Sequence, residues 1–442
     1  MMMIGKLLRL GRRQLHTIIS REVIKPSSPT PSLHQTYNLS ELDQLFGHIY
    51  MPLILYYPNN GSCSLSAHEK AQVLKQSLSK SLTKYYPFAG RLPTPVKPSY
   101  IDCNDEGVVF VEAKNDSPLT TFRNVNEEAE TLDQLFADNL VGQNSPQSRN
   151  VAGVQLNHFA CGGAAVTLSL WHGIGDASTL ASFASHWASV SRYGSTDHQE
   201  VVPINPHFIN SPRTSSVLPE SQVMAGQDRP NWVKRRFVFP NSKLSDLKNK
   251  VAAINNINPT RVEVLFSLIY KTAVSAATKK SGCFQPSCML ILVDIRKRFV
   301  HKLPQTTVGN LLSATMIPTR HQSDTSLSLL ASEIKKVKLQ LEGVQSVQHA
   351  AENIKSLVAK MGNETKRTYT CSSACGFPYD KVDFGWGKPT CATFPVLKAV
   401  DTNGFVLMDA PNGDGIEVIV ILEKEEMEIF ENDKELLSFC QI

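Results

Sequence analysis

The stretch Ser169-Leu170-Trp171-His172-Gly173-Ile174-Gly175-Asp176-Ala177-Ser178 decides the fold, because the hydrophobic period changes within it. Residues 164–170, just upstream, alternate between apolar and small polar side chains, which is the pattern of a half-buried strand. Downstream, apolar residues recur at helical spacing, at Leu180, Phe183, Ala184 and Trp187. Asp176 and Ser178 are of the residue types that cap helix N-termini. The chain is therefore predicted to turn from strand into helix at residues 172–176.

His172 lies at this predicted corner. Gly173 and Gly175 allow the backbone to approach a ligand closely, and they leave the imidazole outside the regular hydrogen-bond ladder. Such a position suits a general base. The chain contains 12 histidines, however, and a His followed four residues later by Asp often arises by chance. A packed or surface histidine is therefore the alternative interpretation.

Length and composition bound the class of protein. The 442 residues predict two domains or one large one, with enough apolar residues for sizeable cores. No run of eighteen uncharged apolar residues occurs, so a membrane-spanning helix is not expected. The nine cysteines form no CxxC pair and are predicted to be reduced thiols, neither disulfides nor zinc ligands. These features favour a cytoplasmic protein.

The charge is uneven only at the N-terminus. Five basic residues precede the first acid, Glu22: Lys6, Arg9, Arg12, Arg13 and Arg21. They account for the whole excess of 45 basic over 40 acidic residues, so no nucleic-acid partner is expected. Residues 1–19 are Arg-rich and acid-free, as organellar presequences are, and the alternative is an extension outside the fold.

Strands and helices are predicted to alternate without a strict βαβ order. The expected strands are residues 51–57, 108–112, 154–159, 164–170, 235–239, 288–293 and 415–422. The expected helices are residues 68–82, 132–137, 242–251, 264–276 and 327–341, with Thr260 as the N-cap of the fourth. This order indicates an α/β fold with a mixed sheet.

A proline-rich stretch between about residues 199 and 231 lacks periodicity. A segment of this length without regular structure is more typical of a connection between domains than of an internal loop. We therefore predict four parts: an extension at residues 1–19, a first domain at 20–200, a crossover linker at 201–231 and a second domain at 232–442.

A second candidate segment is Asp383-Phe384-Gly385-Trp386-Gly387-Lys388-Pro389, which taken alone is most simply a tight turn packed by its two rings. Several common motifs are absent from the sequence. It contains neither a GxxxxGK[ST] phosphate loop nor a GxGxxG after a strand. It contains no HExxH or paired histidine ligands, so no metal is expected, and no GxSxG elbow of a serine hydrolase.

Six motifs occur in a fixed order along the chain. Two are His172-x-x-x-Asp176 and, about 210 residues later, Asp383-Phe384-Gly385-Trp386-Gly387. The others are Tyr86-Pro87-Phe88-Ala89-Gly90-Arg91-Leu92, His158-Phe159-x-Cys161-Gly162-Gly163, Thr260-Arg261-Val262-Glu263-Val264 and Gly309-Asn310. In this order, from about Ser20 to the C-terminus, the chain resembles the plant BAHD acyltransferases. Residues 24–31 are most similar to the vinorine synthase-like branch, whose members acetylate alkaloid alcohols.

The resemblance implies a monomer of two domains, each like chloramphenicol acetyltransferase with a mixed sheet, and a solvent channel between them. An acyl-CoA, most simply acetyl-CoA, and a small alcohol are the expected substrates, and no cofactor is expected to be permanently bound. The expected alcohol is a plant specialised metabolite, a polycyclic monoterpenoid indole alkaloid. His172 is then the catalytic general base, which accepts the proton of the acceptor hydroxyl and returns it to the CoA thiolate.

The resemblance also implies supporting roles for other residues. Asp176 is expected to form a salt bridge with Arg296 and to hold the corner in shape. The loop residues expected to be structural are Asp383, Gly385, Trp386 and Gly387. The residues expected to contact CoA or to line its part of the channel are Ser242, Lys243, Gly309 and Asn310, with a solvated surface as the alternative for Lys243.

Four positions depart from the family pattern. Ala177 follows Asp176 where Gly is common, and Trp171 precedes His172 where a small residue is common. In the segment 373–377, Ala374 and Gly376 stand where many members have Trp and Arg. We therefore place Ala374 and Trp171 at the acceptor pocket and expect an acceptor that is bulky and uncharged at that end.

Two alternative functions stay open at this level. One is a hydroxycinnamoyl or N-acyl transferase that uses the same machinery on other substrates. The other is a non-catalytic binding protein that has kept the scaffold of the family.

Overall fold

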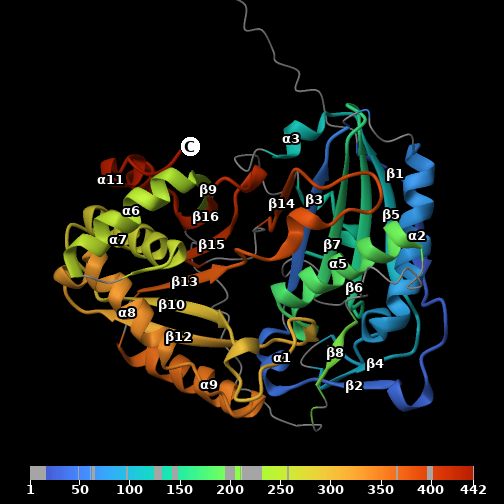
Figure 1. Ribbon diagram of the computed structural model, residues 1–442, viewed down its shortest axis with the longest axis horizontal. Coiled ribbons are helices and arrows are strands. Elements are labelled where there is room, and N and C mark those ends of the chain that lie inside the picture. Colours follow the sequence, from blue (N-terminus) through green and yellow to red (C-terminus); the bar gives the residue numbers. More distant parts are fainter. Residues whose placement is uncertain are drawn as a thin grey trace, which may run out of the picture.

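The structure is a computed structural model, and it describes residues 16–47, 49–59, 61, 65–95, 98–123, 132–141, 148–194, 205–209, 211, 231–255, 258–364, 367–395 and 402–441. The described chain forms two lobes, each built on a six-stranded sheet (Figure 1). Across these residues, every helix is too short or too polar to span a bilayer. The eight described cysteines are not paired in disulfides.

The sheet of the first lobe is mixed, with strand order β1-β5-β6-β7-β3-β14. Its strands are β1 (His16–Ile24), β3 (Tyr50–Tyr57), β5 (Val108–Asn115), β6 (Ala152–Phe159), β7 (Ala164–Trp171) and β14 (Cys391–Thr393). Only the β5–β6 pair is parallel. Helices α2 (Ala67–Lys84) and α5 (Ala177–Tyr193) pack against one face of this sheet and bury a common apolar core with it.

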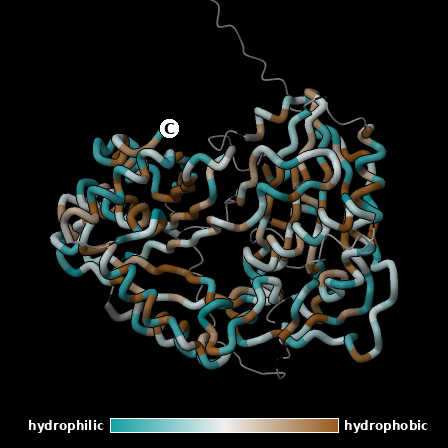
Figure 2. Tube along the Cα trace, in the orientation of Figure 1, coloured by the Kyte–Doolittle hydropathy of each residue, from teal (hydrophilic) through white to brown (hydrophobic). Residues whose placement is uncertain are grey.

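The sheet of the second lobe is also mixed, with strand order β12-β10-β13-β15-β16-β9. Its strands are β9 (Trp232–Phe239), β10 (Ser287–Asp294), β12 (Leu312–Thr319), β13 (Arg367–Ser373), β15 (Gly404–Asp409) and β16 (Ile416–Glu423). The helices of this lobe are α6 (Asn241–Asn255), α7 (Arg261–Ser281), α8 (Leu327–Leu339), α9 (Val347–Glu364), α10 (Lys424–Phe430) and α11 (Lys434–Leu437). Hydrophobic segments follow the strands inside each lobe, whereas many outer turns are hydrophilic (Figure 2). Each sheet therefore has its own core.

The described chain also has shorter α-helices and strands. They are helices α1 (Glu41–Phe46) and α3 (Leu119–Arg123), and strands β2 (Thr36–Asn38), β4 (Tyr100–Asp102), β8 (His207–Phe208) and β11 (Thr307–Val308). Strand β8 lies within the predicted linker, and it pairs in parallel with β11 of the second lobe. The rest of residues 201–231 lies outside the described residues except for positions 205, 206, 209, 211 and 231.

The predicted boundary at residue 19 falls inside strand β1 and needs correction. His16 to Ile24 pair antiparallel with β5 at the edge of the first sheet, so the fold begins no later than His16. The strand was missed because most of its side chains are exposed, Ile18 and Ile19 included, and it carries no apolar alternation. Residues 1–15 of the predicted extension lie outside the described residues.

The division at the linker also differs from the division in space. Strand β14 follows the Asp383–Gly387 loop in the chain, yet it pairs with β3 in the sheet of the first lobe. Ala374, Tyr379 and Phe384 are likewise buried in the core of the first lobe. Residues 374–395 therefore cross back from the second lobe to the first, as the orange segment beside β3 shows (Figure 1).

The other predicted elements agree with the structure to within a few residues. Thr260 caps α7 in a capping box with Glu263, and the helix ends at Gly282, whose φ of +74° suits glycine. Only a short turn of helix is described within 132–137. Strands β12, β13 and β15 and helix α9 were not predicted. Two of them carry local signals that were missed: Tyr369 and Cys371 alternate with polar residues in β13, and Ser346 caps α9 by accepting the N–H of His349.

Candidate active site

The corner after β7 has the predicted form. A single 3-10 turn, His172–Ile174, separates the strand from α5, and the side chain of Asp176 caps the helix by accepting the N–H of Thr179 at 3.0 Å. Gly173 is required here because the indole of Trp171 lies directly over it, and an added Cβ would come within 2.1 Å of that ring. His172 thus lies at the corner between strand and helix, as predicted, and the strand runs one residue further than expected, to Trp171.

Trp171 supports the corner from behind. Its ring nitrogen donates to the carbonyl oxygen of Gly47 at 2.8 Å, and the side chain is almost completely buried. It is not among the residues that line the cavity described below, so its predicted place at the acceptor pocket is wrong. Strand alternation explains the error, because successive side chains at the strand end point to opposite faces.

The main chain of His172 is held on both sides. Its N–H donates to the carbonyl oxygen of Ile49 at 2.8 Å, and its carbonyl oxygen accepts the side-chain amide of Asn310 at 2.6 Å. The imidazole stacks on the ring of Phe46, with ring centroids 5.1 Å apart and an interplanar angle of 17°. The position of the candidate base is therefore determined by two separate segments of chain, residues 46–49 and Asn310.

The predicted salt bridge between Asp176 and Arg296 is present and fully buried. Arg296 donates from Nη1 to Oδ2 of Asp176 at 2.8 Å and from Nη2 to Oδ1 at 2.9 Å. The two oxygens also accept the backbone N–H groups of Thr179 and Leu311. Arg296 in turn donates to the carbonyl oxygens of Thr307 and Gly309. The pair joins the two lobes at the base of the corner.

The opposite charges of Asp176 and Arg296 keep both side chains ionised although both are buried. Burial alone raises the pKa of the Asp176 carboxyl, but the guanidinium of Arg296 and the N–H donors outweigh it, so that this pKa lies below its usual value. Burial likewise lowers the pKa of Arg296, but the charges of Asp176 and Asp294 outweigh it and raise this pKa. Both side chains therefore stay ionised.

Gly309 and Asn310 occupy a different place from the one predicted. Asn310 is completely buried and holds the main chain of His172 from behind, and neither residue lines the cavity. The carbonyl oxygen of Gly309 accepts Arg296 and the hydroxyl of Thr179. The expected position on the channel wall is wrong, because these residues are needed to join β11 and β12 to the corner.

Ser242 and Lys243 lie in the first turn of α6 with exposed side chains, away from the residues that line the cavity. No contact in the described chain assigns them a ligand. Their predicted contact with a CoA phosphate stays a prediction.

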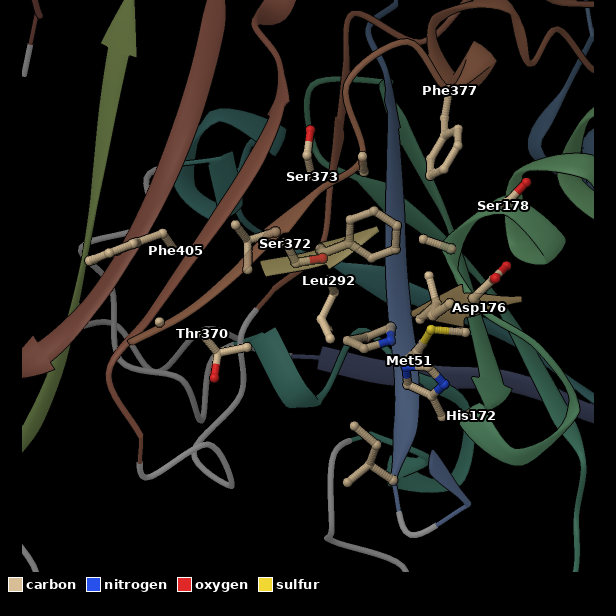
Figure 3. A pocket seen from close by; sticks show the side chains of 18 of the residues that line it. Met51, His172, Asp176, Ser178, Leu292, Thr370, Ser372, Ser373, Phe377 and Phe405 are labelled. Atoms are coloured by element: carbon tan, nitrogen blue, oxygen red, sulfur yellow. The ribbon is translucent and has the colours of Figure 1, made fainter. Parts of the chain in front are cut away.

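A cavity of about 310 Å³ opens on His172, and both lobes contribute to it. Figure 3 shows the side chains around it, among them Met51, His172, Asp176 and Ser178 from the first lobe and Thr370, Ser372, Ser373 and Phe405 from the second. Most of the wall is apolar, and its charged members are Asp176 and Asp294. Ala374 lines the cavity as predicted, next to Phe377.

The glycine-rich loop makes contacts that fit its predicted structural role. One oxygen of Asp383 accepts the N–H groups of Gly385 and Gly387, and the other accepts Arg192 of α5 at 2.9 Å. Phe384 is fully buried and meets Trp187 edge to face, with centroids 4.7 Å apart. The loop binds α5 to the returning segment and contributes no side chain to the cavity.

Within the described chain, no group of three or more His, Cys, Asp or Glu side chains is placed to hold a metal ion. What the site offers is one imidazole at the wall of a largely apolar cavity, with a buried ion pair beside it. This arrangement suits proton transfer to or from a small apolar ligand.

The sequence analysis missed Phe46 and Asp43, both on α1. Asp43 has a local signal, because Ser40 three residues earlier forms a capping box with it. Phe46 has none, because its stacking partner His172 is far away in the chain.

Comparisons with known proteins agree with this geometry. Residues 16–437 match the model of the Transferase family. The chain is 34% identical over 446 residues to 17,18-epoxy-17-hydroxycur-19-ene N-malonyltransferase of Strychnos nux-vomica, which covers 96% of this chain and 90% of that one. It is also 34% identical to deacetylvindoline O-acetyltransferase of Catharanthus roseus, over 95% of this chain and 97% of that one.

Solved structures have the same fold. Vinorine synthase superposes with a TM-score of 0.79 at 29% identity, over 96% of this chain and 98% of that one. TRI101 of F. sporotrichioides, complexed with coenzyme A and T-2, superposes with a TM-score of 0.69 at 17% identity, over 92% and 99% of the two chains.

Proposed function

The chain belongs to the BAHD acyltransferases of the Transferase family, and we propose that it transfers an acyl group from an acyl-CoA to a hydroxyl of a small apolar acceptor. The observation that carries the proposal is the placement of His172 on the wall of a cavity between two chloramphenicol acetyltransferase-like lobes. Two substrates that meet in such a cavity need only a base between them.

In the proposed reaction, the His172 imidazole accepts the hydroxyl proton as the acceptor oxygen bonds to the thioester carbonyl carbon. The tetrahedral intermediate then collapses, the carbon–sulfur bond breaks, and the protonated imidazole returns the proton to the departing CoA thiolate. General-base catalysis of this kind contributes roughly 10² to 10⁴ in rate. The thioester is already activated, so the step requires no covalent enzyme intermediate.

In this mechanism Asp176 has a structural role and is not the third member of a catalytic triad. Each of its oxygens accepts two hydrogen bonds, from Arg296 and from a backbone N–H. These bonds use both oxygens of the carboxylate to hold the corner. The positive charge that forms on His172 during the reaction is transient.

We propose a bulky, largely apolar alcohol as the acceptor, of the class of polycyclic alkaloids, with acetyl as the acyl group. The apolar wall of the cavity and the small side chain of Ala374 support this choice. The deacetylvindoline O-acetyltransferase of Catharanthus roseus, an O-acetyl transferase by its name, supports it independently.

N-acylation is the second candidate. A similar relative, that of Strychnos nux-vomica, is named an N-malonyltransferase, so the family scaffold accommodates both a nitrogen acceptor and a longer acyl group. An amine attacks only in its neutral form, so this activity would rise with pH through the pKa of the amine.

The first experiment measures thiol release from acetyl-CoA and malonyl-CoA with a panel of polycyclic alcohols and amines. We expect release with wild type and a fall of about 10² or more in His172→Ala. His34→Ala is the matched control, because His34 is an exposed histidine outside the cavity.

Three outcomes separate the alternatives. Release with alcohols supports the O-acyl transferase, and release with amines alone overturns it in favour of N-acylation. Binding of an alkaloid without release from any donor overturns both and leaves the non-catalytic binding protein.

The cytoplasmic location, the monomeric state and the contact of Ser242 and Lys243 with CoA also stay proposals. Fluorescent fusions with and without residues 1–19 test the location, and light scattering tests the oligomeric state. Charge reversal by Lys243→Glu, which should raise the KM for the acyl-CoA and not that for the acceptor, tests the CoA contact.

A further inference from the structure

Helix α1 and the turn after it make several of the contacts that hold residues 171 and 172. Phe46 stacks on the His172 imidazole, and the carbonyl oxygen of Gly47 accepts the Trp171 ring nitrogen. The carbonyl oxygen of Ile49 accepts the N–H of His172. The six-residue helix α1 and the turn after it thus contact both the imidazole ring and the main chain of His172.

Asp43 acts on the other side of His172, through Asn310. Its Oδ1 accepts both the backbone N–H and the side-chain amide of Asn310, at 2.7 and 3.0 Å. The same amide nitrogen donates its second hydrogen to the carbonyl oxygen of His172 at 2.6 Å. Because both hydrogens of this NH₂ group have acceptors, the orientation of the Asn310 amide is determined.

The other oxygen of Asp43 ties the network to the start of α1. Oδ2 accepts the N–H of Ser40 at 3.0 Å and its hydroxyl at 2.6 Å, which closes a capping box. Asp43 is almost completely buried. One carboxylate therefore fixes both the first turn of α1 and, through Asn310, the carbonyl of the candidate base.

Helix α1 is itself anchored in the second lobe. Leu42 is fully buried in a cluster with Ile295 and Leu311 and with residues of α9, and Phe46 packs against the same cluster. Glu41 forms a salt bridge with Lys355 of α9 at 2.7 Å. In Figure 1 the helix lies between the two lobes. Helix α1, which is anchored in the second lobe, thus contacts His172 of the first lobe.

We propose that α1 positions the catalytic base: Phe46 holds the plane of the His172 imidazole, and Asp43, through Asn310, holds its main chain. An aromatic ring parallel to the imidazole restricts rotation of that ring about its side-chain bond. A general base must lie within hydrogen-bond reach of the proton that it accepts, so a loose imidazole loses rate without losing substrate. The proposal rests on the proposed function only in that His172 is the base.

The test compares Phe46→Ala with Phe46→Tyr, which keeps the stacked ring. We expect Phe46→Ala to lower kcat by about tenfold to a hundredfold with little change in KM, and Phe46→Tyr to restore most of kcat. In parallel, the rate at which diethyl pyrocarbonate modifies His172 is followed by peptide mass spectrometry. This rate should rise several-fold in Phe46→Ala, because one face of the imidazole is uncovered.

Asp43 is tested by the pair Asp43→Ala and Asp43→Asn, since the asparagine keeps an acceptor for Asn310. We expect the alanine variant to lower kcat and the asparagine variant to retain most of it. Glu263→Ala is the matched control, because Glu263 is a buried capping-box carboxylate of α7, outside the residues that line the cavity. It should reduce stability without changing the kcat of the folded enzyme or the modification rate of His172.

The proposal is overturned if the Phe46 and Asp43 variants behave like Glu263→Ala, with lower stability and an unchanged kcat and modification rate. The modification rate does not depend on acyl transfer. If wild type transfers no acyl group, a faster modification of His172 in Phe46→Ala still supports the positioning role, and the proposed function alone fails.

Discussion

Asp176 and Arg296 face each other through two hydrogen bonds of 2.8 and 2.9 Å, with both side chains removed from solvent. They are 120 residues apart in the chain and come from different lobes. Asp176, which follows the candidate base His172 by four residues, therefore connects the two lobes. The corner that presents His172 depends on this joint.

Replacing Arg296 by Met tests how much the joint stabilises the fold. The variant leaves the Asp176 carboxylate buried without its cation, so we expect the free energy of unfolding to fall by about 3 to 5 kcal/mol. Urea unfolding followed by fluorescence measures this loss. The control is Arg192→Met, which removes a half-exposed partner of Asp383 and should cost less than about 1 kcal/mol. Similar losses in the two variants would contradict the assignment.

The pH dependence of stability should report the ionised state of Asp176. Its pKa in the folded chain lies below the usual 3.8, so its stabilising contribution is complete above that value and is lost as the pH falls through the folded-state pKa. Asp176→Asn should therefore destabilise fully near neutral pH and progressively less below about pH 4. Thermal unfolding of both proteins across this range measures the difference. A difference that stays constant down to the lowest pH at which both fold would contradict it.

Replacing Ala374 by Trp should restrict the acceptor. The indole would fill part of a cavity of about 310 Å³, so turnover of a polycyclic alcohol should fall by about tenfold or more, while a small alcohol should be little affected. Steady-state kinetics with both alcohols measure the ratio, and Ala374→Ser serves as the control of nearly equal size. Equal turnover of the two alcohols by the Trp variant would rule out this location for the acceptor.

Replacing Gly385 by Ala should separate stability from catalysis. Gly385 has a φ of +110°, a region that a residue with a Cβ adopts only under strain, so a loss of about 1 to 3 kcal/mol in stability is expected. The loop packs on Trp187 through Phe384 and does not line the cavity, so kcat of the folded protein should stay unchanged. A lower kcat at an unchanged melting temperature would place the loop in the catalytic machinery instead.

Much of the local structure was predictable from the sequence. Strand β7 was predicted from its alternation of apolar and small polar residues, although both of its faces are buried rather than one. Helix α7 begins at a Thr260–Glu263 capping box and ends at a glycine. The glycine at position 173 and the cap at Asp176 likewise predicted the corner that carries His172. Such features can be predicted because each depends on residues within a few positions of one another.

Several of the errors have a common origin in contacts between distant segments. Strand β1 shows no alternation because it lies at an exposed sheet edge, and β14 joins the first sheet only because residues 374–395 fold back onto it. Asn310 was placed on the cavity wall, whereas the structure puts it behind His172. No local pattern records which distant surface a segment meets.

The sequence by itself determined the family, the strand-to-helix corner and the identity of the candidate base, since these depend on motifs and on short-range periodicity. Only the tertiary structure decided that Asn310 and Asp43 hold the main chain of His172 and that Phe46 stacks on its ring. It also decided that both lobes line the cavity. The physical reason is that burial and shape complementarity bring these groups together, and both depend on the whole packed chain rather than on neighbours in sequence.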